Sequence, residues 1–161
     1  MEIREASEAD WPAIWPIVEA VARAGETFTY PRDLDPVFGR TLWMQPPPGV
    51  TLVAVEDGRV LGTAKTGPNH MGPGSHVATA SFMVAAEARG QGVGRALGEA
   101  VIARARAAGY RAMQFNAVVE ANRSAVRLWR ALGFEVIGTA PEAFDHPTEG
   151  LVGLHIMYRR L

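Results

Sequence analysis

The chain has 161 residues, of which 48% are hydrophobic and 20% charged, and these proportions exclude a largely disordered protein. Its 16 lysines and arginines nearly balance its 17 aspartates and glutamates, which argues against binding of nucleic acid or an anionic membrane through overall charge. The absence of cysteine excludes disulfides, cysteine-ligated zinc and a cysteine nucleophile.

The first third of the chain predicts a strand followed by two helices. Ser7 can cap the first helix and Pro12 is tolerated in its first turn, whereas Pro16 should kink or divide it. The predicted strand is 3–6; the first predicted helix follows Ser7 and runs to about residue 24, and the second is 33–43.

The rest of the chain alternates between strand and helix patterns. Asp57-Gly58 between two apolar runs is a strong hairpin signal. Apolar residues at four-residue steps predict a helix that Gly109 ends; they are Val93, Leu97, Val101 and Ala105. The predicted strands are 50–55, 59–66, 76–84, 111–118, 134–138 and 151–159, and the predicted helices are 93–108 and 122–132. The order βααβββαβαββ indicates an α/β (α+β) fold with a mixed sheet covered by helices.

A glycine-dense turn joins the strand 76–84 to the helix 93–108. Glycines allow close approach of a ligand to the backbone, and the free N–H groups of a helix start form an anion site. Arg89 and Arg95 flank this turn, so a pyrophosphate is the natural ligand. The spacing is not that of a P-loop, and a Rossmann turn is disfavoured because several strands precede it.

Two segments resemble the GNAT acetyltransferases, which use acetyl-CoA. Arg89-Gly90-Gln91-Gly92-Val93-Gly94 is similar to the family motif Arg/Gln-x-x-Gly-x-Gly/Ala, and residues 122–134 are similar to its segment Asn-x-x-Ala-x-x-Leu-Tyr-x-x-x-Gly-Phe. The resemblance extends over essentially the whole chain. It implies the GNAT fold, a mixed sheet of six to seven strands flanked by about four helices, in which the strand ending near Val84 splays from the strand 111–118.

The same resemblance implies an N-acetyltransferase with acetyl-CoA as co-substrate. The backbone before the turn would pair with the pantetheine amides, and the turn would hold the pyrophosphate. The implied cofactor-binding residues are Phe82, Met83, Val84, Arg89, Gly90, Gln91, Gly92, Val93, Gly94, Arg95, Asn122 and Trp129. No metal is expected, because the four histidines lack ligand spacing.

Further stretches resemble a GNAT subgroup that includes the yeast azetidine-2-carboxylate N-acetyltransferase; they are residues 74–77, 114–119 and 150–152. That subgroup acetylates a small cyclic amine that carries a carboxylate, and two asparagines are implicated in substrate binding and catalysis. One corresponds to Asn116, and the other falls on Thr79, a departure from the subgroup. A second departure is Trp129, because many family members have a tyrosine there that protonates the departing thiolate, and indole is no general acid.

The acid and the base stay open at this point. Ser124, Tyr30 or water could protonate the thiolate, and Glu120, His76 or His146 could take the proton of the amine. Loops 25–31 and 143–147 mix aromatic and polar residues, as ligand pockets do. The catalytic candidates are Asn116, Ser124 and Glu120, and the substrate-binding candidates are Glu26, Phe28, Tyr30, His76, Thr79 and Asn116.

The preferred function is acetyl transfer to a small amine or amino-acid-like substrate by direct attack in a ternary complex. A protein acetyltransferase acting on lysines or N-termini, and an acyl-CoA-binding sensor without turnover, remain alternatives. We expect a single domain, residues 1–161, that forms a homodimer. We expect it in the cytoplasm, because no apolar run approaches the roughly 18 residues of a membrane span. Nucleic acid and membrane are not expected as partners.

Overall fold

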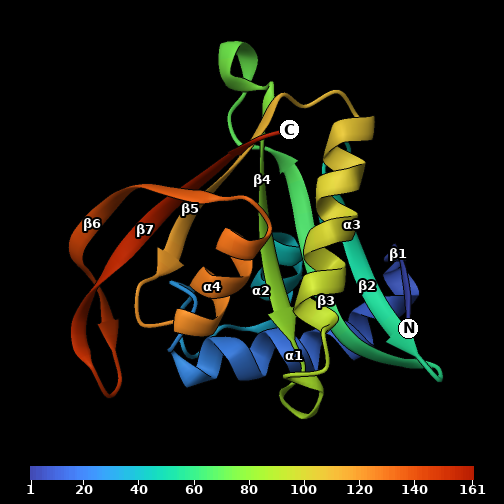
Figure 1. Cartoon of the computed structure of the whole chain (residues 1–161). Helices are drawn as coiled ribbons and strands as arrows, with labels where there is room; N and C mark the ends of the chain where they lie inside the picture. The colour runs from blue at the N-terminus through green and yellow to red at the C-terminus, as the bar shows by residue number, and fades with distance from the viewer.

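The computed structural model describes the whole chain, residues 1–161, as one mixed seven-stranded sheet with four α-helices (Figure 1). The strands are β1 (Glu2–Glu5), β2 (Val50–Glu56), β3 (Arg59–Pro68), β4 (Val77–Val84), β5 (Ala112–Val119), β6 (Glu135–His146) and β7 (Gly150–Arg160). The helices are α1 (Trp11–Ala24), α2 (Pro36–Trp43), α3 (Val93–Ala107) and α4 (Arg123–Ala131). The predicted mixed sheet of six to seven strands with about four helices is confirmed.

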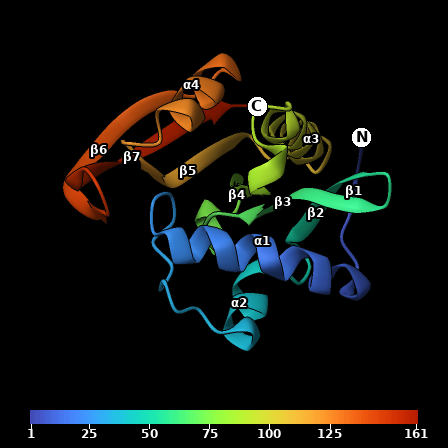
Figure 2. The same cartoon turned by 90° about the horizontal axis from the view of Figure 1, so that it is seen from below.

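The helices cover both faces of the sheet. Figure 2 shows α1 and α2 on one side and α3 and α4 on the other. The four-residue repeat of α3 faces the core as predicted, since Leu97 and Val101 are fully buried, and α1 buries Ile14 and Val18 from the opposite side. None of the helices combines the length and hydropathy that a bilayer crossing requires.

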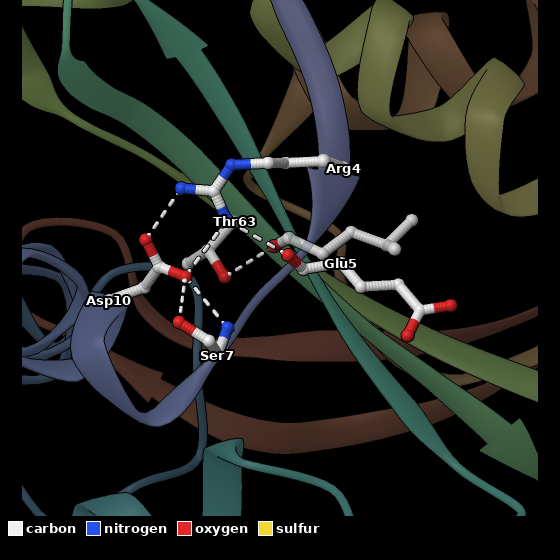
Figure 3. A network of polar contacts seen from close by, with 6 residues as sticks. Arg4, Glu5, Ser7, Asp10 and Thr63 are labelled. Atoms are coloured by element: carbon white, nitrogen blue, oxygen red, sulfur yellow. Dashed lines mark hydrogen bonds and ion pairs between the residues drawn. The ribbon is translucent and has the colours of Figure 1, made fainter.

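The start of α1 differs from the sequence prediction. Ser7 precedes a separate 3-10 turn, Glu8–Asp10, whose Asp10 carboxylate accepts hydrogen bonds from the backbone N–H and the hydroxyl of Ser7 at 2.7 and 3.0 Å (Figure 3). Arg4 donates two further hydrogen bonds to Asp10, at 2.7 and 2.9 Å, and this pairing holds the pKa of Asp10 well below its usual range. The helix begins only at Trp11.

Pro16 was expected to kink or divide the first helix, and of these two outcomes division does not occur. The helix continues through Pro16 from Trp11 to Ala24. Ile14, Ile17 and Val18 are buried on one side of the helix, and burial of this apolar face holds the segment together across the missing backbone N–H.

Two other predicted boundaries are wrong. The second helix begins at Pro36 rather than residue 33, because the Asp35 carboxylate accepts hydrogen bonds from the N–H groups of Val37 and Phe38 and caps it there. Residues 143–147, predicted as a substrate loop, belong to the β6–β7 hairpin, where Phe144 pairs with Val152. The pairing continues past two irregularities in β6, which a period-two pattern does not reveal.

Strands β4 and β5 are parallel neighbours only at their first residues. Val77 pairs with Ala112 and Ala78 with Met113, and no further pair follows. The strands then diverge (Figure 1), although β4 stays paired to β3 and β5 to β7. The splayed strands that the family resemblance implied are therefore present, and they leave unpaired backbone edges inside the sheet.

Candidate functional site

Two adjoining cavities lie along the divergence of β4 and β5. The first, here called the turn cavity, has about 600 Å³ and is lined by the glycine turn, the end of β4 and the start of α4. The second, here called the split cavity, has about 200 Å³ and lies between β4, β5 and the loop Thr27–Tyr30. They share five lining residues, Thr27, Phe82, Asn122, Ala125 and Trp129, so a ligand can extend from one into the other.

The glycine turn presents its backbone to the turn cavity. Gly90 and Gly92 have φ of 76° and 81°, a left-handed conformation that favours glycine, and Gly92 immediately precedes α3. The first N–H groups of α3 are without helical acceptors, and the exposed side chains of Arg89 and Arg95 line the same cavity. The donor set fits a diphosphate, which two guanidinium groups and a helix start can bind together.

Most of the other residues that the family resemblance implies for cofactor binding also line the turn cavity. Phe82, Met83 and Val84 line the turn cavity from the unpaired edge of β4. Gln91 does not line it, because its side chain donates to the Glu87 carbonyl at 2.8 Å. This amide is therefore turned to the protein backbone rather than to a ligand.

The start of α4 contributes two polar side chains. The Asn122 oxygen accepts from the Ala125 N–H at 3.4 Å and from the Ser124 hydroxyl at 3.2 Å. Asn122 lines both cavities, so capping the helix and facing a ligand are compatible, as expected from the sequence. Ser124 lines the turn cavity.

Trp129 is a packing residue in this structure. Only 7% of it is exposed, and its ring lies 4.6 Å from that of Phe82 and 5.0 Å from that of Phe115, measured between centroids. It lines both cavities and belongs to the hydrophobic core, a position that fits packing against a ligand or the core.

The loop side of the split cavity is anchored by Lys65, which sequence reasoning did not identify as a site residue. Its ammonium donates to the Leu42 carbonyl at 2.6 Å and lies 5.7 Å from the ring centre of Tyr30 and 5.5 Å from that of Trp43. Burial lowers the pKa of Lys65 and raises the pKa of Tyr30 to about 12. The one feature of the sequence that could have drawn attention to Lys65 is that it is the single lysine of the chain.

Asn116 lines the split cavity, but its surroundings differ from the expectation. It is exposed rather than buried among apolar residues of its strand, because β5 has no neighbour on the side of the split. Its amide is hydrogen-bonded to those of Asn69 and Gln114, and Asn69 was not anticipated. Thr79 lines the same cavity from β4, and Phe28 and Tyr30 line it from the loop.

The candidate bases lie outside the split cavity. Glu120 follows β5 and is exposed, His146 lies at the end of β6, and His76 precedes β4 where the two strands still pair. Glu26 lines the turn cavity instead. No three histidine, aspartate or glutamate side chains come together as a metal-binding group.

Comparisons with known proteins support the same fold. The family model described as Acetyltransferase (GNAT) family matches residues 3–134. A solved structure of a GCN5-related N-acetyltransferase from Kribbella flavida is 58% identical, with a TM-score of 0.97 over 99% of this chain and 97% of that one. A GNAT superfamily phosphinothricin acetyltransferase from Sinorhizobium meliloti, solved in complex with AcCoA, is 25% identical, with a TM-score of 0.87 over 99% of this chain and 88% of that one.

A curated relative matches over a shorter region. N-acetyltransferase aca1 from Schizosaccharomyces pombe is 33% identical over 84 residues, which are 52% of this chain and 40% of the relative. The chain thus spans less than half the length of this curated relative.

Proposed function

The chain belongs to the Acetyltransferase (GNAT) family, and we propose that it is an acetyl-CoA-dependent N-acetyltransferase that acetylates a small amine. The observation that carries the proposal is the divergence of β4 and β5 after Ala78 and Met113, with a cavity that continues from the glycine turn into the split. The acetyl-CoA complex of the related phosphinothricin acetyltransferase supports the choice of co-substrate.

The turn cavity would hold acetyl-CoA. The glycine turn, Arg89 and Arg95 would bind its diphosphate, and the unpaired backbone of Phe82–Val84 would pair with the pantetheine amides. Asn122 lines both cavities and would bind where the pantetheine arm passes between them. The bound thioester supplies the activated acetyl group.

The transfer itself needs one nucleophile and two proton movements. The lone pair of the acceptor nitrogen attacks the carbonyl carbon, the C–N bond forms and the C–S bond breaks, the nitrogen loses one proton and the sulfur gains one. A backbone N–H near Val84 would stabilise the developing oxyanion. The chain has no cysteine, so a cysteinyl acetyl intermediate is excluded. The candidates to protonate the thiolate are Tyr30, which lies in the split cavity, Ser124, which lies in the turn cavity, and a bound water.

The size of the split cavity supports a small acceptor over a protein. It has about 200 Å³, and the loop Thr27–Tyr30 forms one wall, whereas a protein substrate needs an open groove. Asn116 in this cavity, together with the likeness to the azetidine-2-carboxylate subgroup, adds amino-acid-like acceptors to the proposal.

We also propose that residues 1–161 act as one domain and form a homodimer in the cytoplasm. The single sheet that includes all seven strands supports the first part. Sedimentation velocity tests the second, and a monomer at micromolar concentration would reject it.

A thiol-release assay tests the proposed function. We expect acetyl-CoA with a panel of small amines, including azetidine-2-carboxylate and proline, to release free thiol in an acceptor-dependent way. Isothermal titration calorimetry with acetyl-CoA alone separates binding from turnover. Binding without thiol release for any acceptor would favour the acyl-CoA sensor, and release with lysine peptides alone would favour the protein acetyltransferase.

A further inference from the structure

The split cavity contains no charged side chain. Its 16 lining residues include neither Asp, Glu, His, Lys nor Arg. Its polar groups are the hydroxyls of threonine, serine and tyrosine and the amides of Asn116 and Asn122. Tyr30 is the one titratable side chain among them, and its pKa is raised to about 12, so near neutral pH its phenol is protonated and no base.

The charged groups of the surrounding elements are directed elsewhere. Lys65 on β3 does not line the cavity; its ammonium lies 5.7 Å from the ring centre of Tyr30 and donates to the Leu42 carbonyl. Arg123 on α4 pairs with Glu149 at 2.8 Å. His155 on β7 is the register partner of Val118, and its Nδ1 lies 2.7 Å from the Thr139 hydroxyl; the residue does not line the cavity. Other nearby groups also lie in the turn cavity or outside both cavities; they are Glu26, Arg89, Arg95, His76, Glu120 and His146.

This composition matters because the acceptor nitrogen must present a lone pair. An ammonium ion has none, and its burial without a carboxylate partner is costly. Aromatic rings such as those of Phe28 and Phe82 can attract a cation, but they cannot remove its proton. Hydroxyl and amide groups are no bases near neutral pH either.

We propose that the acceptor nitrogen enters the split cavity as an uncharged amine, and that the protein therefore selects weakly basic amines over ammonium-forming alkylamines at neutral pH. This inference rests on the proposed function. Weakly basic amines include fluoroalkylamines and alkoxyamines. With an uncharged acceptor, the nitrogen loses one proton and the sulfur gains one, so no net proton is released and no base in the cavity is required. Amino-acid-like acceptors such as azetidine-2-carboxylate, and lysine side chains, carry ammonium groups at neutral pH. They would be acetylated through their small uncharged fraction, so their kcat/KM would rise with pH.

The dependence of kcat/KM on pH tests this inference. The probes are two pairs of similar shape, ethylamine with trifluoroethylamine and benzylamine with O-benzylhydroxylamine, in a thiol-release assay at saturating acetyl-CoA between about pH 6 and 9. For ethylamine and benzylamine, kcat/KM per total amine should rise about tenfold per pH unit up to the pKa of the amine. For the two weakly basic amines it should be nearly flat over the same range.

A plateau for ethylamine or benzylamine at a pH well below the amine's own pKa would reveal a base on the protein and overturn the inference. Glu26→Gln removes the carboxylate that lines the adjoining turn cavity, and Glu120→Gln removes the one that directly follows β5. We expect the tenfold slope in both variants, whatever their absolute rates. If the pH dependence of kcat/KM becomes less steep or steeper in either variant, the base is assigned to that residue and the inference is overturned. Thiol release from none of the four amines would instead overturn the acetyltransferase function itself, and this inference with it.

Discussion

The side-chain amides of Asn69 and Asn116 bond to each other in both directions across the narrow end of the split. Asn116 Nδ2 donates to Asn69 Oδ1 at 2.7 Å, and Asn69 Nδ2 donates to Asn116 Oδ1 at 3.3 Å. Gln114 Nε2 donates to the same oxygen of Asn116 at 3.0 Å. Since this oxygen already accepts two hydrogen bonds, the remaining N–H of Asn116 is the group that the amide can offer to a ligand.

Replacing Asn116 should therefore impair chemistry rather than folding. We expect Asn116→Ala to lower kcat/KM for acetyl transfer at least tenfold, which corresponds to about 1.4 kcal/mol in the barrier. The affinity for acetyl-CoA and the melting temperature should stay close to wild type, because Asn116 is exposed. Full activity in this variant would contradict a role for the amide, and a large loss of stability would assign it a structural role.

Asn69 should act through Asn116 and have a smaller effect. We expect Asn69→Ala to lower kcat/KM by about threefold to tenfold, since it removes one reciprocal pair of neutral hydrogen bonds. Asn69→Asp keeps the acceptor for Asn116 Nδ2 and should recover part of the loss. In Asn116→Ala the Asn69→Ala change should have no additional effect; an additive loss in the double variant would contradict the coupling.

The glycine turn can be tested at Gly94 without backbone strain. A Cβ at Gly94 would lie 3.4 Å from Leu128 Cδ2 and 3.9 Å from Val84 Cγ2, on the side of the turn cavity. We expect Gly94→Val to weaken acetyl-CoA binding at least tenfold in calorimetry. Gly92 is a poorer choice, because its φ of 81° strains any other residue.

Gly138→Val is a matched control for the turn, since a Cβ at Gly138 meets no atom within 4 Å and the residue lies far along the chain on β6. Its acetyl-CoA affinity should equal that of wild type. Equal affinity in Gly94→Val as well would remove the glycine turn from the binding site.

Lys65 should affect the acceptor and not the co-substrate. Lys65→Met keeps the apolar stem but removes the ammonium that lies over Tyr30 and bonds to the Leu42 carbonyl. We expect the acceptor KM to rise about threefold or more, because the loop carrying Tyr30 loses an anchor, while the Kd of acetyl-CoA is unchanged. A rise in both constants would point to a general loss of structure.

Asp10 should contribute to stability in a pH-dependent way. The Arg4 guanidinium and Ser7 lower the pKa of Asp10, so its contribution is present above the unfolded-state pKa of about 4 and is lost as the pH falls below it. We expect Asp10→Asn to cost about 1–2 kcal/mol in urea unfolding at pH 7. The difference from wild type should shrink steadily below about pH 4. A difference that is independent of pH would show that the ion pair does not contribute.

Local patterns in the sequence were enough to determine the order of the elements and the position of the glycine turn, whereas the splayed strands were implied only by the family resemblance. The buried face of α3 at Val93, Leu97 and Val101 repeats with the helical period, and the glycines before it mark the start of a helix, so both can be identified from neighbouring residues alone. By contrast, the β6–β7 hairpin was predicted too short because irregularities interrupt its alternation.

The composition of the split cavity was decided only by the tertiary structure. Asn69 reaches Asn116 because β3, β4 and β5 are neighbours in the sheet, and Lys65 reaches Tyr30 because β3 lies beneath the loop after α1. Glu120 and His146 looked equally suitable as bases but lie outside the cavity. Strand order and the point at which two strands diverge determine which side chains come together. Neither can be predicted from the periodicity of the sequence.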